Sequence, residues 1–233
     1  MPRRNYHQAR HEIAVIHEDR DFVVVDKAAG QYVHASPGHE HDTLAQGLVL
    51  MYPEMACVGS KERPGVVHRL DAQTSGVMVF ARTPKGYHSL RQAFEGHERV
   101  KKTYLAILQG KLPQPQGTLV AGIGRKPWDP KRMAIDGMDA KRSVTHWTTL
   151  SRKNGLSLVE FVIETGRTHQ IRVVAAHLGA PVAGDELYGG AANAHTRFPR
   201  HMLHAVTLEF PHPASGRMVA FSAPPPPDFM YAC

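Results

Sequence analysis

The chain contains the segment Val66-Val67-His68-Arg69-Leu70-Asp71-Ala72-Gln73-Thr74-Ser75-Gly76-Val77-Met78-Val79-Phe80. In this segment apolar residues lead into a charged triplet, a small polar turn and a second apolar run. The pattern predicts that Val66 and Val67 end one buried strand and that residues 77–80 form the next strand. Asp71 is therefore expected on the loop between two buried strands, two residues from Arg69.

Asp71 is a candidate nucleophile or general base. A carboxylate at the edge of an apolar core needs a cation or a hydrogen-bond donor, and its surroundings shift its pKa. The alternative is a structural ion pair between Arg69 and Asp71 that fixes the loop. The local pattern alone favours that alternative, because structural ion pairs also perturb pKa values.

Residues 68–76 read His-Arg-Leu-Asp-x-x-Thr-Ser-Gly, which resembles the catalytic-loop signature of the RluA-type pseudouridine synthases. Asp71 occupies the position of that family's invariant aspartate. Further segments agree in order and spacing, so the resemblance extends from about residue 13 to residue 223. It implies an α+β pseudouridine synthase fold, in which a large mixed, mostly antiparallel sheet has flanking helices and a central basic cleft that holds Asp71.

A second motif lies in residues 99–108, which alternate as a strand with Tyr104, Ala106 and Leu108 on one face. A tyrosine in a strand is usually part of the core. However, Lys101-Lys102-Thr103-Tyr104 resembles the family's second motif, whose tyrosine stacks on the target base. The resemblance implies a catalytic role for Tyr104, with proton removal as a further possible role, and it makes Lys101 and Lys102 candidate RNA contacts.

A third motif begins at Glu164 and precedes an expected helix, for which Thr168 is the predicted N-cap. Arg172 lies in the first turn of this helix, where a cation opposes the helix dipole, so we expect it to have an anionic partner. The segment resembles the family's third motif. The resemblance implies that Arg172 pairs with Asp71 and that Ile171 lines the base pocket.

The other motif residues are candidate RNA contacts by the same resemblance. They are His68, Arg69, Arg167 and Gln170, and Arg69 is expected to fill the space that an extruded uridine leaves. Residues 125–133 are expected to form an exposed basic loop in which Arg125 and Lys126 contact phosphates. Trp128 in this loop either stacks on a base or packs against the protein.

Short runs elsewhere predict further strands at residues 13–17, 22–25, 118–123, 143–150, 156–164, 201–210 and 217–222. Asn154-Gly155 is a strong hairpin signal between two of them. Two helices are expected earlier in the chain. One begins at Asp42 and carries Leu44, Leu48 and Met51 on one face; the other begins at Thr83-Pro84.

Composition narrows the class of protein. The chain has 233 residues and a formal charge of +7, which is compatible with a polyanionic partner. Its two cysteines, Cys57 and Cys233, provide neither a disulfide framework nor a cysteine-based zinc site. No apolar run approaches the roughly 18 residues of a membrane span. We expect a cytoplasmic monomer with a basic flexible tail (residues 1–11) and a single catalytic domain (residues 12–233) that lacks an additional N-terminal RNA-binding domain.

The expected function is isomerisation of specific uridines to pseudouridine in structured RNA, with ribosomal RNA favoured over transfer RNA. An isomerisation needs no redox cofactor, and the chain has no Gly-rich nucleotide loop, so we expect no cofactor. Two alternatives remain open. One is a non-catalytic RNA-binding protein on the same scaffold. The other is a metal-dependent hydrolase suggested by sixteen histidines, although none of them shows a recognisable ligand spacing and no metal site is expected.

Overall fold

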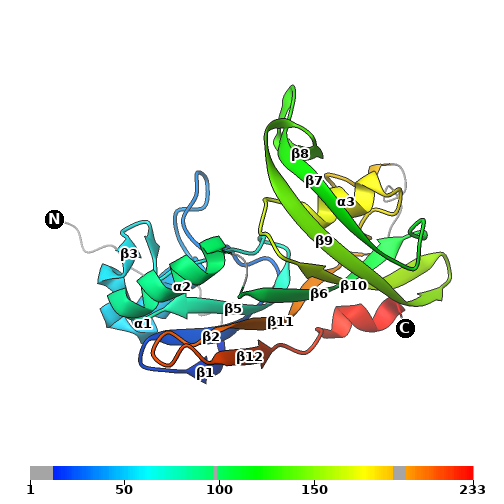
Figure 1. Cartoon of the computed structure of the whole chain (residues 1–233). Coiled ribbons are helices and arrows are strands. Elements are labelled where there is room, and N and C mark those ends of the chain that lie inside the picture. The colour runs from blue at the N-terminus through cyan, green and yellow to red at the C-terminus, as the bar shows by residue number, and fades with distance from the viewer. Residues whose placement is uncertain (1–12, 97–98, 191–197, 233) are drawn as a thin grey trace.

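One ten-stranded sheet forms the body of the protein (Figure 1). The computed structural model describes residues 13–96, 99–190 and 198–232, so the predicted tail, residues 1–11, lies outside the described residues. The strands follow the order β1-β2-β5-β11-β6-β10-β9-β7-β8, and β12 also pairs with β11. Among the described strands, only the pairing of β5 with β11 is parallel, so the predicted mostly antiparallel α+β fold is confirmed.

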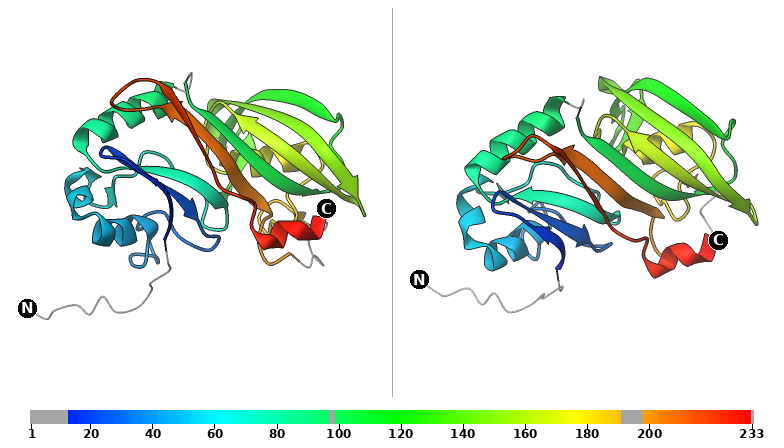
Figure 2. Two further views of the ribbon diagram at one scale, coloured as in Figure 1. Left: turned by 90° about the horizontal axis from the view of Figure 1, so that it is seen from below. Right: turned by 60° about the horizontal axis from the view of Figure 1, so that its bottom comes forward.

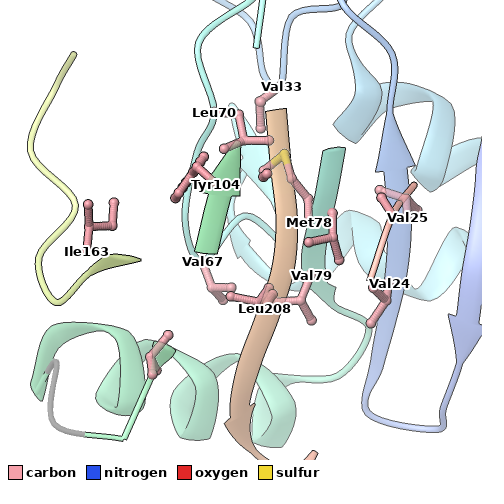
Figure 3. Packing of buried hydrophobic residues seen from close by; sticks show 14 of the residues in the cluster. Val24, Val25, Val33, Val67, Leu70, Met78, Val79, Tyr104, Ile163 and Leu208 are labelled. Carbon is pink, nitrogen blue, oxygen red and sulfur yellow. The ribbon is translucent and has the colours of Figure 1, made fainter. Parts of the chain in front are cut away.

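The first half of the sheet consists of an exposed edge strand, β1, and three largely buried strands. These are β1 (Ala14–Glu18), β2 (Phe22–Lys27), β5 (Ser75–Ala81) and β11 (Leu203–Pro211). Residues 22–25 of β2 have no exposed surface, as expected for a continuous apolar run that is covered on both faces. Leu70, directly before Asp71, lies in the same buried cluster as Met78 and Tyr104 (Figure 3). The core therefore extends to the base of the loop that carries Asp71.

Two helices accompany this half. Helix α1 (Leu44–Met51) is followed by the short 3-10 helix η1 (Pro53–Cys57) and by a small hairpin of β3 (Gly59–Ser60) and β4 (Arg63–Pro64). Helix α2 (Pro84–Gly96) packs on β5 and β11. Its predicted start is confirmed, because Thr83 Oγ1 accepts a hydrogen bond from the Gly86 amide at 3.0 Å.

The second half of the sheet consists of β6 and of long hairpins, whose strands β7, β8 and β9 rise away from the first half (Figure 1). The strands are β6 (Lys101–Gln109), β7 (Gln116–Lys126), β8 (Asp129–Ile135), β9 (Met138–Lys153) and β10 (Leu156–Ile163). Asn154 and Gly155 join β9 to β10 with positive φ angles of 51° and 77°, so the predicted hairpin turn is confirmed. The predicted loop over residues 125–133 is wrong, because most of this segment belongs to the β7–β8 hairpin.

Three other sequence predictions need correction. Val66 makes a single bridge to Phe80 instead of ending a strand, because the chain turns at Gly65 just before it. Helix α1 is capped by Thr43, whose hydroxyl accepts from the Gln46 amide while the Gln46 side chain accepts from the Thr43 amide. Met51 of this helix is 47% exposed and does not belong to its buried face.

After the hairpins, the chain returns to the middle of the sheet, where β11 lies between β5 and β6. Helix α3 (Gln170–His177) is followed by β11, by β12 (Met218–Ser222) and by the 3-10 helix η3 (Pro227–Ala232). Both views of Figure 2 place η3 beside the start of β11. Within the described ranges, no helix is both long enough and apolar enough to cross a membrane.

Candidate active site

Asp71 and Arg172 form a partly buried ion pair, as the third motif predicts. Arg172 Nη1 lies 2.9 Å from Asp71 Oδ2, and the Arg172 side chain is only 6% exposed. Asp71 keeps 19% of its side-chain surface exposed. A charge-assisted hydrogen bond of this length in a sheltered place fixes the carboxylate while leaving it open on one side.

Asp185 holds the other side of the same guanidinium. Arg172 Nε donates to Asp185 Oδ2 at 2.7 Å and Arg172 Nη2 donates to Asp185 Oδ1 at 2.9 Å. The Leu187 and Tyr188 amides also donate to Asp185 Oδ1, at 3.0 and 3.1 Å. Asp185 therefore fixes the planar fork of Arg172 so that its remaining Nη1 points at Asp71. The sequence motifs did not point to this role of Asp185.

The pair determines the charge of Asp71. Burial raises the pKa of the Asp71 carboxyl, but the nearby His169 and Arg172 and the hydrogen bond from Arg172 outweigh burial, so the pKa lies below its usual value. Of these two neighbours, Arg172 is the one that is charged at pH 7. Burial lowers the pKa of His169 below its usual value of about 6.5, so the His169 ring is mainly neutral at pH 7. Asp71 is thus an anion at neutral pH.

His169 connects Asp71 to the β7–β8 hairpin. The Met133 amide of β8 donates to Tyr188 Oη at 2.8 Å, and Tyr188 Oη lies 2.8 Å from His169 Nδ1. His169 Nε2 in turn lies 3.8 Å from Asp71 Oδ2. His169 has a left-handed φ of 56° and is the residue directly before α3, so Thr168 is not the cap that sequence analysis predicted. A positive φ is uncommon for residues other than glycine, although histidine adopts it more readily than most, and such residues are often found at functional sites.

The polar turn after Asp71 is fixed to β11. Thr74 Oγ1 lies 2.8 Å from His201 Nε2, and Ser75 Oγ lies 2.9 Å from His204 Nδ1. Gly76 has a φ of 115°, and a Cβ there would lie 2.1 Å from the Ala205 carbonyl oxygen. The Thr-Ser-Gly part of the motif is therefore the part that docks the Asp71 loop onto the sheet.

Two buried basic side chains hold the backbone of the same loop. Lys27, at the end of β2, donates from Nζ to the Ala28 and Ala72 carbonyls, both at 2.8 Å. Burial lowers the pKa of Lys27 to about 7. Arg200 donates from Nη1 to the Gln73 carbonyl at 3.0 Å. The two carbonyls that follow Asp71 are thus each held by a basic side chain from a distant part of the chain.

A pocket of about 80 Å³ opens beside Asp71. Tyr104 and Leu203 from the sheet and Ile171 from α3 line it, and Arg69 and Arg167 are among its polar residues. Burial and the Asp71 charge raise the pKa of Tyr104 above its usual value, so the phenol stays protonated at neutral pH. This speaks against the additional role of Tyr104 as a base, whereas a flat ring in the pocket wall suits stacking.

Comparison with known proteins identifies the family. The family model described as RNA pseudouridylate synthase matches residues 21–177. The chain belongs to the RNA pseudouridylate synthase family. Asp71, Tyr104 and Arg172, three residues that meet at the pocket, all lie inside the matched range.

Individual relatives agree with this family. The ribosomal large subunit pseudouridine synthase D of Xanthomonas campestris is 44% identical over 92% of this chain and 66% of its own length. An uncharacterized RNA pseudouridine synthase of Bacillus subtilis is 38% identical over 93% of this chain and 70% of its own length. The chain thus spans about two thirds of the length of the curated relatives it matches.

A solved structure has the same fold. The human RNA pseudouridylate synthase domain containing 1 matches with a TM-score of 0.76 and 30% identity, over 93% of this chain and 85% of that chain. The human RNA pseudouridylate synthase domain containing 4, which is 24% identical, matches with a TM-score of 0.70 over 94% of this chain and 90% of that chain. The second likeness concerns the fold alone.

Three residues predicted to contact RNA instead face the protein interior of this family member. His68 Nε2 lies 3.1 Å from the Val79 amide, and its ring stacks on Phe94. The Gln170 side chain is buried and makes hydrogen bonds to β9 and to residues 165 and 167. Lys102 is buried and donates to the Thr165 carbonyl at 3.1 Å. Their hydrogen bonds within the fold favour structural roles over the predicted RNA contacts.

The other predicted contacts remain accessible. Arg69 is exposed at the pocket, and Arg167, also a pocket residue, donates to the Arg142 carbonyl at 3.0 Å. Lys101 lines an open groove of about 870 Å³ that shares Ile163 with the pocket. Arg99 and Arg142 line the same groove, and neither was predicted from the sequence. Arg125 and Lys126 are exposed near the end of the β7–β8 hairpin.

Metal-binding side chains do not gather in the part of the chain that the structure describes. In residues 13–96, 99–190 and 198–232, no group of three or more His, Cys, Asp or Glu side chains is arranged to hold a metal ion. His201 and His204 instead bond to hydroxyls of the Asp71 loop. The abundance of histidine therefore has structural explanations at these two positions.

Proposed function

We propose that the protein converts uridine to pseudouridine in RNA and that Asp71 is the residue that acts on the ribose or the base. The proposal rests mainly on one observation. An ionised carboxylate, held by a buried arginine, faces a small pocket with an aromatic wall. The family assignment supports the same chemistry.

The reaction is a balanced isomerisation. The bond between ribose C1′ and uracil N1 breaks, the uracil turns, and a bond forms between C1′ and C5. The hydrogen on C5 leaves as a proton, and N1 gains one. Because nothing is oxidised or reduced overall, the chain's own acid–base and nucleophilic groups suffice. Asp71 serves as nucleophile or base, and Arg172 keeps it ionised.

The target uridine must leave its stack before it can reach Asp71. This costs a few kcal/mol. Stacking on the Tyr104 ring returns about 1–3 kcal/mol per base, and Ile171 gives the pocket an apolar wall. Arg69, exposed at the mouth of the pocket, is placed to occupy the space that the uridine leaves.

We propose that the RNA backbone follows the groove next to the pocket. Arg99, Lys101 and Arg142 give this groove a positive lining, with Glu164 as its acidic member. Cationic side chains in an open groove contact phosphates without reading the sequence. This path would present one nucleotide to Asp71 while its neighbours stay in the groove.

We propose ribosomal RNA as the substrate, with transfer RNA as the alternative. The support is the name of relatives such as the Xanthomonas campestris protein, a ribosomal large subunit pseudouridine synthase. We further propose that residues 12–233 act as a single catalytic domain and that the protein is a cytoplasmic monomer. A sheet that includes both the first and the last described strands supports the single domain.

The test is a map of pseudouridine in purified RNA that carries no earlier modification. Unmodified ribosomal and transfer RNA, transcribed in vitro, are incubated with the purified protein or with Asp71→Asn, and pseudouridine is located at nucleotide resolution. We expect new pseudouridine in ribosomal RNA with the wild type alone. New pseudouridine in transfer RNA only would make transfer RNA the substrate instead of ribosomal RNA. RNA binding without any pseudouridine would favour the non-catalytic alternative, and equal signal from the variant would remove the role of Asp71.

A further inference from the structure

Trp128 stands at the tip of the β7–β8 hairpin with its side chain fully in solvent. Its relative exposure is 102%, and its φ is 64°. The second tryptophan of the chain, Trp147, is buried and donates to the Gln114 carbonyl. The hairpin projects away from the body of the protein (Figure 1). A large aromatic residue in such a place has no packing role within the described residues.

The backbone at this tip would suit a smaller residue. Lys126 pairs with Asp129, so Pro127 and Trp128 are the two central residues of the turn. A proline at the first central position and a positive φ at the second are typical of a type II turn. Glycine or asparagine is usual at that second position. A side chain with Cβ is disfavoured there. Tryptophan is therefore present despite the backbone preference, and an observed outlier of this kind points toward function.

Positive charge surrounds the tip. Arg125, Lys126 and Lys131 are exposed on the two strands next to it. Asp129 is the acidic residue of the turn, and it already lies 3.3 Å from Arg132. A stacking ring flanked by cations is the combination that binds single-stranded nucleic acid: the ring takes a base, and the cations take the phosphates on either side.

We propose that the tip of the β7–β8 hairpin binds RNA by stacking Trp128 on an unpaired base, with Arg125, Lys126 and Lys131 on the flanking phosphates. The inference rests on the proposed function and adds a second contact to it. The substrate is then an RNA that offers an unpaired nucleotide in addition to the target uridine.

The hairpin geometry separates this nucleotide from the target. Met133 is the hairpin residue that hydrogen-bonds to Tyr188, and Trp128 lies five residues further along. Arg125 pairs with Met133 and lies three residues before Trp128. At about 3.3 Å per strand residue, Trp128 therefore reaches at most about 10 Å beyond Met133. Tyr188 is itself connected to Asp71 through His169. The stacked base is therefore not the one at Asp71, and recognition at the tip fixes how the RNA lies over the pocket.

The binding test uses the emission of the exposed tryptophan. Two RNA duplexes are compared, identical except that one carries a single unpaired purine. The bulged duplex is expected to quench the wild-type emission more strongly. Trp128→Phe, which leaves only the buried Trp147, is expected to bind the bulged duplex without this quenching.

Affinity separates stacking from charge. Trp128→Ala is expected to lose about 5- to 150-fold in affinity for the bulged duplex with an unchanged salt dependence, whereas Phe restores most of the loss. Lys126→Ala is expected to reduce the slope of log affinity against log salt by about 1. Trp128→Gly, which suits the turn, is expected to bind as weakly as Trp128→Ala while its melting temperature does not fall. Leu150→Ala, which removes another exposed apolar side chain, is the matched control.

Equal binding of both duplexes by the wild type and by Trp128→Ala would overturn the proposal. Self-association of the wild type that Trp128→Ala abolishes, with RNA binding unchanged, would also overturn it and assign the tip to a second copy of the chain. Pseudouridine formation on unmodified ribosomal RNA is measured in parallel. Normal activity of Trp128→Ala would reject the hairpin contact and leave the proposed function standing. An inactive wild type would reject the proposed function, and the quenching measurement would still test the hairpin contact.

Discussion

Arg172 is held between two carboxylates, and the two interactions have different consequences. Its paired contacts with Asp185 fix the guanidinium, whereas its single contact with Asp71 keeps that residue charged. Removing one partner of a buried charge costs about 3–5 kcal/mol, because the other charge is left uncompensated. Arg172 therefore supports both the stability of the fold and the ionisation of Asp71.

The pKa of Asp71 gives a prediction for the pH dependence of the reaction. Because the folded-state pKa lies below the unfolded value of about 3.9, Asp71 stays ionised down to acidic pH. Its contribution to stability is likewise present above that value and is lost as the pH falls through the folded pKa. We expect the single-turnover rate to show no decline due to Asp71 between pH 7 and pH 5.

The variant Arg172→Lys tests whether Arg172 keeps Asp71 ionised. Lysine cannot bond both carboxylates through one planar fork, so burial should raise the pKa of Asp71 and move the acidic decline toward neutral pH. The rate at pH 8 should fall as well. An acidic decline at the same pH in both proteins would show that Arg172 does not set the ionisation of Asp71.

At the scale of the elements, the sequence predicts the local features. Among the contacts between distant segments, the pair of Asp71 and Arg172 was expected only through the family resemblance. The apolar runs of β2 and β5 and the Asn154-Gly155 turn are visible in the sequence, because each depends on adjacent residues. The hydrogen bond of Thr74 to His201 spans 127 positions and leaves no local pattern. Asp185 escaped prediction for the same reason: its partner comes from another element.

The strand period of β6 bears on one of the predicted RNA contacts. Lys102 has the same parity as Tyr104 in β6, and alternation places both side chains on the buried face. Membership in a motif favoured an RNA contact, whereas the strand period pointed inward. The hairpin over residues 125–133 was harder to predict, because two prolines and charged residues hide its strand pairing.

Gly76 provides a prediction for the docking of the Asp71 loop. Gly76→Ala places a Cβ against the Ala205 backbone at a positive φ, so the loop must shift away from β11. We expect a melting temperature lower by several degrees, corresponding to about 1–3 kcal/mol, and loss of pseudouridine formation.

Gly110→Ala is the matched control, since Gly110 also has a positive φ, of 93°, but nothing lies within 4 Å of its added Cβ. It should show only the cost of backbone strain, about 1 kcal/mol, with normal activity. If Gly76→Ala were as active and as stable as this control, the close approach to β11 would not hold the loop.

At the scale of the whole molecule, the formal charge of +7 matters for RNA binding through the places where the basic side chains lie. Arg99, Lys101 and Arg142 lie along the groove that continues the pocket, while the hairpin tip carries a separate basic group. Under the proposed function, these two separate basic surfaces would hold the RNA at two points, so the orientation of the substrate would follow from the fold.

Salt dependence tests the groove. Arg142→Gln should weaken binding of ribosomal RNA and lower the slope of log affinity against log salt by about 0.7–0.9, the value for one lost phosphate contact. Arg152→Gln, which removes an exposed cation at the distant β9–β10 turn, should leave the slope unchanged. Equal slopes for Arg142→Gln and the wild type would exclude a phosphate contact at Arg142.

The most direct measurement of the central claim is release of the C5 hydrogen from uridine. RNA transcribed with uridine tritiated at C5 is mixed with excess protein, and tritium in water is counted against pseudouridine formed. We predict one tritium released per pseudouridine with the wild type and none with Asp71→Asn, which should still bind the RNA. Tritium release by Asp71→Asn at the wild-type rate would contradict the account, because another residue would then carry the reaction.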